Sequence, residues 1–74
     1  MKFVQVFKTD VPDRQMARHI IHFLQQKFSQ CRINFDLDDC DRILRIESWQ
    51  GSVEEGEIRL LIARYGYQCE PLRD

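Results

Sequence analysis

Two carboxylates stand between an apolar, strand-like segment and an amphipathic, helix-like segment, and they are the first side chains that could do chemistry. Asp10 and Asp13 lie three residues apart in this connection. Carboxylate oxygens suit hard cations such as Mg²⁺, Ca²⁺ and Mn²⁺, but a tight calcium site needs about six to eight oxygens. The same carboxylates can accept hydrogen bonds from the free amides at a helix N-terminus. We therefore expect them to cap the helix, with a metal site as the less favoured alternative.

A pair of histidines follows on the predicted helix. His19 and His22 are three residues apart and share one helix face. Two imidazoles can contribute to a zinc site, which needs a third and usually a fourth ligand. The sequence offers no third strong ligand beside them, so we expect surface histidines that serve at most as accessory ligands.

The acidic run at residues 36–41, followed by Glu47, superficially resembles a calcium-binding loop. Such a loop requires glycine at its sixth position and helices on both sides. Here Asp41 stands at the sixth position, and both flanks have strand patterns. The run therefore predicts a solvated hairpin tip, whose charges discourage edge-to-edge aggregation.

Three cysteines occur at widely spaced positions: Cys31, Cys40 and Cys69. An odd number without a CxxC pair favours reduced thiols over a disulfide framework. Cys31 alternates in phase with apolar residues and is expected in the core, whereas Cys40 is expected to be exposed in a turn. The chain has no Cys–His nucleophile, glycine-rich phosphate loop, serine elbow or paired acid–base motif. We expect neither an enzyme nor a cofactor.

Trp49 closes the third predicted strand and is the only tryptophan. We expect it to cover the core beneath the turn into the second helix. If it is exposed instead, it is a candidate binding anchor, because tryptophan is enriched at interaction hot spots.

Size and charge limit the function classes. The 74 residues predict one domain, 1–74, with a net charge of −1. Basic residues are scattered singly, so neither nucleic acid nor an anionic membrane is an expected partner. The N-terminal apolar stretch is too short for a signal peptide, and no run reaches transmembrane length. We therefore expect a cytoplasmic protein.

The hydrophobic periodicity predicts six elements in the order strand, helix, strand, strand, helix, strand. The predicted strands span residues 2–8, 31–38, 42–48 and 67–72. The first helix spans about residues 12–29. The second helix starts with a capping box formed by Ser52 and Glu55 and stops at Gly66.

This order predicts an α+β fold, the ferredoxin-like βαββαβ sandwich. Two helices would cover one face of a four-stranded antiparallel sheet and leave the other face wet. Pro71 predicts an edge position for the last strand, or the end of that strand, because proline cannot donate to a ladder.

Over most of its length the chain resembles heavy-metal-associated domains. Phe35-Asp36-Leu37 is similar to that family's hydrophobic-Asp-Leu run, and Gly66-Tyr67 to its Gly-Tyr before the last strand. Residues 9–13 align with the family's Thr-Cys-x-x-Cys metal loop and place Asp10 and Asp13 at the two cysteine positions. The resemblance implies the same fold, without the soft thiolates that Cu(I) requires.

We therefore expect a small non-catalytic binding or adaptor module, similar to a heavy-metal-associated domain that lacks its thiol site. It would meet a protein partner through its wet sheet face or an edge strand. One alternative is a metal-binding or metal-transport protein with Asp10, Asp13 and a histidine as ligands. The other is a small-molecule-sensing regulatory domain, since such domains share this element order.

Overall fold

A computed structural model describes residues 1–72 of the chain and contains two helices and four strands. In chain order these are β1 (Phe3–Thr9), α1 (Arg14–Lys27), β2 (Cys31–Asp36), β3 (Ile43–Ser48), α2 (Glu55–Arg64) and β4 (Cys69–Pro71). The predicted element order is confirmed. No helix in this part of the chain combines the length and the apolar character needed to cross a membrane.

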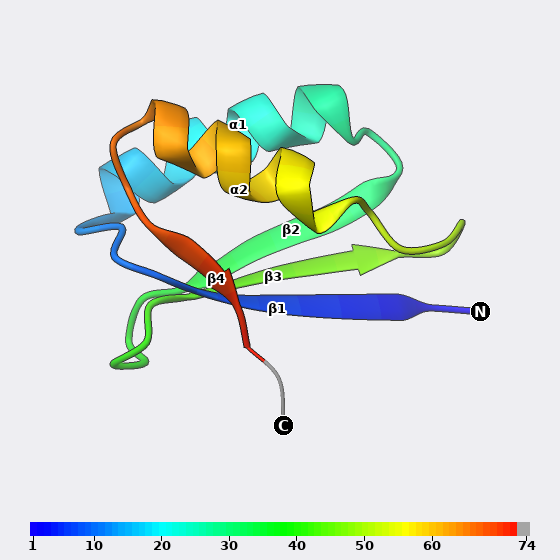
Figure 1. The fold of residues 1–74 in the computed structure, drawn as a ribbon, viewed down its shortest axis with the longest axis horizontal. Helices are drawn as coiled ribbons and strands as arrows, with labels where there is room; N and C mark the ends of the chain where they lie inside the picture. The colour runs from blue at the N-terminus through cyan, green and yellow to red at the C-terminus, as the bar shows by residue number, and fades with distance from the viewer. Residues whose placement is uncertain (73–74) are drawn as a thin grey trace.

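The strands form one antiparallel sheet in the order β2-β3-β1-β4. Both helices lie side by side on the same face of this sheet, as Figure 1 shows. The predicted α+β class is therefore confirmed, and the strand order is that of a ferredoxin-like arrangement. Within residues 1–72 the opposite face carries no helix, and we call it the open face.

The core lies between the helices and the sheet because side chains alternate across each strand. Phe7 and Leu44 face each other on β1 and β3, and Ile46 pairs with Ile33 of β2. All four are buried and contact the apolar stripes of the helices. Those stripes consist of Ala17, Ile20 and Leu24 from α1, and Ile58, Leu61 and Ile62 from α2.

Helix α1 is shorter than the predicted 12–29 because its ends are fixed by caps. Asp13 adopts an extended backbone as the N-cap, and its side chain accepts a hydrogen bond from Met16. At the other end Phe28 is the C-cap and donates its N–H to the Leu24 carbonyl. Pro12 thus lies just before the cap, outside the helix.

The predicted capping box of α2 is wrong. The helix begins at Glu55, and Glu54 rather than Ser52 is its N-cap. The cause lies in a distant strand: the Gln5 side chain accepts from the Val53 N–H and donates to the Val53 carbonyl. Because both backbone groups of Val53 are engaged by β1, the residue cannot join the helix.

Strand β4 is an edge strand of three residues, much shorter than the predicted 67–72. It pairs with β1 at Phe7, Lys8 and Thr9. Pro71 ends the strand, so the predicted edge position is confirmed. Gly66, at φ +91°, supplies the left-handed turn that precedes it.

Candidate functional site

The connection between β1 and α1 contains the two predicted site carboxylates, and each has a structural hydrogen bond. Asp13 Oδ1 accepts from the Met16 N–H at 2.9 Å. Asp10 Oδ1 accepts from the Gln68 N–H at 2.7 Å and so holds the segment that leads into β4. Capping is therefore confirmed for Asp13, whereas Asp10 holds a neighbouring loop instead. A metal role for the pair stays a prediction.

Arg42 fastens the same connection from the other side. Its Nη1 donates to the carbonyls of Val11 and Pro12, at 3.1 and 2.8 Å. Its own carbonyl accepts a 2.6 Å hydrogen bond from the Thr9 hydroxyl, which also accepts from the Val11 N–H. Several carbonyl and hydroxyl oxygens that a hard cation would use are therefore engaged by the protein itself.

His19 and His22 lie on the exposed side of α1, as expected for surface histidines. The His22 ring contacts the Gln26 amide, with 3.0 Å between the two Nε2 atoms. Neither histidine belongs to any group of three or more clustered metal ligands found in residues 1–72. The accessory-ligand role stays a prediction.

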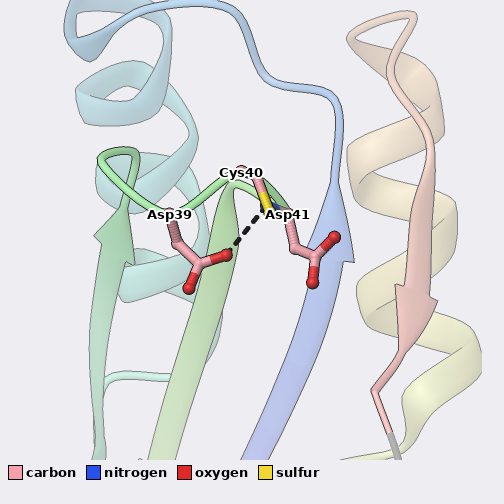
Figure 2. A group of neighbouring side chains, drawn as sticks. All are labelled: Asp39, Cys40 and Asp41. Atoms are coloured by element: carbon pink, nitrogen blue, oxygen red, sulfur yellow. Dashed lines mark hydrogen bonds between the residues drawn. The ribbon is translucent and has the colours of Figure 1, made fainter.

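The clustered ligands within residues 1–72 lie at the β2–β3 hairpin tip instead. Figure 2 shows Asp39, Cys40 and Asp41 there, with ligand atoms within 4.8 Å of one another. The dashed line marks the Asp41 N–H donating to Asp39 Oδ1 at 2.9 Å. This is the local side-chain bond that aspartates commonly form in turns. Lys8 Nζ lies 3.8 Å from Asp41 Oδ1, so the fold already supplies a cation at the tip.

The cysteines differ in exposure. Cys40 is exposed, as predicted, and Cys31 is half-buried against the core. Cys69 is the buried thiol, and burial raises its pKa to about 12. A thiol with so high a pKa stays protonated near neutral pH and is a poor nucleophile. The short alternation around Cys69 gave little sign of this burial in the sequence.

Trp49 directly follows β3 and is 50% exposed, beside Arg32 of the open face. Its ring contacts the Arg32 guanidinium, whose central carbon is 6.0 Å from the ring centroid. This distance is at the outer limit of a cation–π interaction. Half of the Trp49 surface is in solvent, so the expectation that Trp49 covers the core is wrong for that half. The alternative of an exposed aromatic side chain is confirmed.

Charged and apolar side chains alternate around this tryptophan. Lys2 Nζ lies 3.0 Å from Glu47 Oε2, and this hydrogen bond lowers the pKa of Glu47. Val4, paired with Glu47 across β1 and β3, is 48% exposed. The patch formed by Lys2, Val4, Arg32, Glu47 and Trp49 will be called the Trp49 patch.

A hollow of about 370 Å³ lies further along the open face, where the hairpin tip approaches the sheet. Apolar side chains of Val6, Ile43 and Leu72 line it, together with Arg45 and several carboxylates. The open face therefore offers both a raised aromatic side chain and a depression with mixed charge. Such a combination suits a protein surface better than a small apolar ligand.

Comparisons with protein-family models, curated proteins and solved structures find no significant match to this chain. The fold and the surface define a small α+β domain with a ferredoxin-like strand order and a mixed, aromatic-bearing open face. The resemblance to heavy-metal-associated domains remains a prediction from the sequence.

Proposed function

We propose that this protein is a non-catalytic binding module that meets a protein partner through the Trp49 patch. The observation that carries the proposal is that Trp49 is 50% exposed and contacts Arg32, whose side chain lies on the open face. A tryptophan buries a large area with little conformational entropy to lose, which is why it recurs at interaction hot spots. An exposed tryptophan gives a domain that binds no partner no comparable gain in free energy.

The surroundings of Trp49 support the same function. Arg32 contacts one side of the ring, and an ion pair joins Lys2 and Glu47 beside it. Side chains that are already ordered lose less entropy when a partner binds. Exposed Val4 extends the apolar area beside these charges. An apolar centre with a charged rim is the usual anatomy of a protein interface.

The metal alternative is less well supported by the geometry. Asp10 and Asp13 each accept a backbone hydrogen bond, and Arg42 occupies carbonyls of the same loop. Titration of Zn²⁺ and Cu(I) against a competing chelator tests this alternative directly. Stoichiometric binding tighter than about 1 μM that is lost in Asp10→Ala would replace the proposal with the metal function.

The binding proposal is tested by capture from the cell of origin with three immobilised proteins. These are the wild type, Trp49→Ala, and the control Leu60→Ala, which removes another exposed apolar side chain, from α2. We expect a partner that the wild type and the control retain and that Trp49→Ala loses. A partner retained equally by all three proteins would contradict the role of the patch.

A direct titration then follows binding to the captured partner. The chain has one tryptophan, so its intrinsic fluorescence reports on this position alone. Burial of Trp49 should shift its emission to shorter wavelength, with at least about tenfold weaker binding for Trp49→Ala, measured calorimetrically. An unchanged spectrum on saturation would place the partner elsewhere on the molecule.

A further inference from the structure

The outer edge of β2 presents backbone groups that no other element of residues 1–72 pairs with. At the start of the strand, the backbone groups of Cys31 already have partners: its N–H donates to the Phe28 carbonyl, and its carbonyl accepts from the Gln25 side-chain amide. Outward-facing groups alternate along an antiparallel strand. Ile33 and Phe35 therefore direct their N–H and C=O groups outward, away from β3.

The other side of the sheet is less suited to strand addition. In β4, Pro71 has no N–H to donate, and Arg59 Nε already donates to the Cys69 carbonyl at 3.1 Å. The part of β1 that extends past β4 is short, because Leu72 hydrogen-bonds to Val6 and blocks an incoming strand there. The β2 edge is the one at which a strand of useful length could pair.

We propose that β2 pairs with β2 of a second copy of this chain, antiparallel and centred on Asn34, to form a symmetric dimer. Because a twofold axis relates the two strands, the numbers of any two facing residues add up to the same value. Centring on Asn34 places Ile33 opposite the second copy's Phe35. These two positions carry the outward backbone groups that would exchange the hydrogen bonds.

Charge complementarity selects the second copy as the occupant. In this register Arg32 stands opposite the second copy's Asp36, and the twofold axis repeats the pair. Opposite charges at directly facing positions stabilise a strand pair, and like charges destabilise it. Arg32 and Asp36 are both exposed on the open face, and neither has an ion-pair partner closer than 4.0 Å within residues 1–72.

The opposite side of the strand is apolar and completes the match. Ile33 and Phe35 would meet their counterparts on the helix-bearing face, where both already contact the core. Beside them lies a groove of about 270 Å³ between α1 and the end of β2, lined by Ala17, Ile21 and Leu37 among others. The register places this groove next to the second copy's Cys31 and the loop before it, which would cover its apolar floor.

Charge exchange tests the register. We expect the wild type to dimerise at about 100 μM in sedimentation velocity, and each of Arg32→Asp and Asp36→Arg to weaken dimerisation at least about tenfold. An equimolar mixture of the two single variants should form a heterodimer. In it, positions 32 and 36 are both acidic in one chain and both basic in the other, so both facing pairs combine opposite charges. A purely structural role of either residue cannot produce this recovery.

A cross-link provides a second readout that does not depend on charge. Asn34→Cys, in a Cys40→Ser background, should form an intermolecular disulfide under mild oxidation, since facing residues in non-hydrogen-bonded pairs have Cβ atoms about 4.5–5.5 Å apart. Asp36→Cys in the same background is the control and should cross-link far more slowly.

Two outcomes would overturn the dimer. One is a wild type that remains monomeric at about 1 mM, well above the range of functional self-association. The other is a dimer whose affinity is unchanged by both charge reversals. Circular dichroism of each variant separates loss of pairing from loss of folding. Capture of a partner through Trp49 by a monomeric wild type would leave the proposed function intact while refuting the dimer.

Discussion

Gln5 and Val53 exchange two hydrogen bonds across 48 residues of chain: the Gln5 Nε2 donates to the Val53 carbonyl at 2.9 Å, and the Val53 N–H donates to Oε1 at 2.7 Å. A side-chain amide thus takes the place of a neighbouring strand. It holds the β3–α2 connection against β1 and fixes where α2 begins.

Replacing this amide should destabilise the domain. We expect Gln5→Ala to lower the free energy of unfolding by about 1–3 kcal/mol, because both backbone groups of Val53 lose their partners in a partly buried site. Urea denaturation followed by circular dichroism measures the change. Gln5→Glu is the matched control: it retains the acceptor, lacks the donor above its pKa, and should recover stability relative to wild type as the carboxyl is protonated. Equal stability of Gln5→Ala and wild type would show that water replaces the tether.

The helix cap at Asp13 has a smaller expected contribution. Asp13→Ala should cost about 0.5–2 kcal/mol, since the Met16 amide loses its acceptor and α1 its N-terminal negative charge. Asp13→Ser keeps a capping oxygen and should recover most of the loss. The free energies of unfolding of both variants are measured by denaturant titration, once in chelator-containing buffer and once with divalent metal added. A loss in Asp13→Ala that appears only when divalent metal is present would indicate a metal ligand instead.

Arg42 combines an unfavourable backbone with favourable side-chain contacts. Its φ of +46° lies in the left-handed region that glycine adopts more easily, and its guanidinium donates to two carbonyls. Arg42→Ala loses the contacts and keeps the strain, whereas Arg42→Gly loses both. We expect Arg42→Gly to be more stable than Arg42→Ala by about 1 kcal/mol. Thermal denaturation of the two variants measures this, and the reverse order would contradict the strain.

The burial of the Cys69 thiol predicts a loss of stability at alkaline pH. Burial raises its pKa to about 12 in the folded chain, above the ordinary thiol value of about 9. Between these values the unfolded chain releases the proton and the folded chain retains it, so stability falls as pH rises from about 9 to 12. The free energy of unfolding, measured from pH 8 to 10.5, should fall less steeply in Cys69→Ala than in wild type. Parallel slopes would contradict the assignment.

The same burial predicts an order of thiol reactivity. Iodoacetamide at pH 8 should modify exposed Cys40 well before Cys69, since the thiolate is the reactive form and access is required. Mass spectrometry of peptides from the folded protein gives the order. Adding urea should make the two rates similar, and equal rates without urea would show that Cys69 is open to solvent.

The sequence was sufficient for the fold where a pattern is local. Alternation along residues 31–38 and helical spacing along residues 12–29 both reflect one buried face, and the structure buries those faces. Asp13 was also predictable, because a cap bonds only three residues ahead. The hairpin tip followed from the closely spaced aspartates at residues 38–41.

Long-range contacts determined what the sequence could not show. The start of α2 depends on Gln5, and the role of Asp10 depends on Gln68, 58 residues away. Arg42 was unremarkable in the sequence because its partners lie in another loop. The exposure of Trp49 follows from the position of the whole sheet relative to the helices, which no local spacing encodes.

The hydrogen bond from Arg59 to the Cys69 carbonyl also limits how large an assembly this domain can build. A sheet with two usable edges could add subunits at both ends and grow into a fibre. Here Arg59 and Pro71 close one end, so the proposed pairing through β2 would stop after two molecules. Because Pro71 still lacks an N–H donor in Arg59→Ala, this variant should form no species larger than a dimer, measured by sedimentation velocity at high concentration.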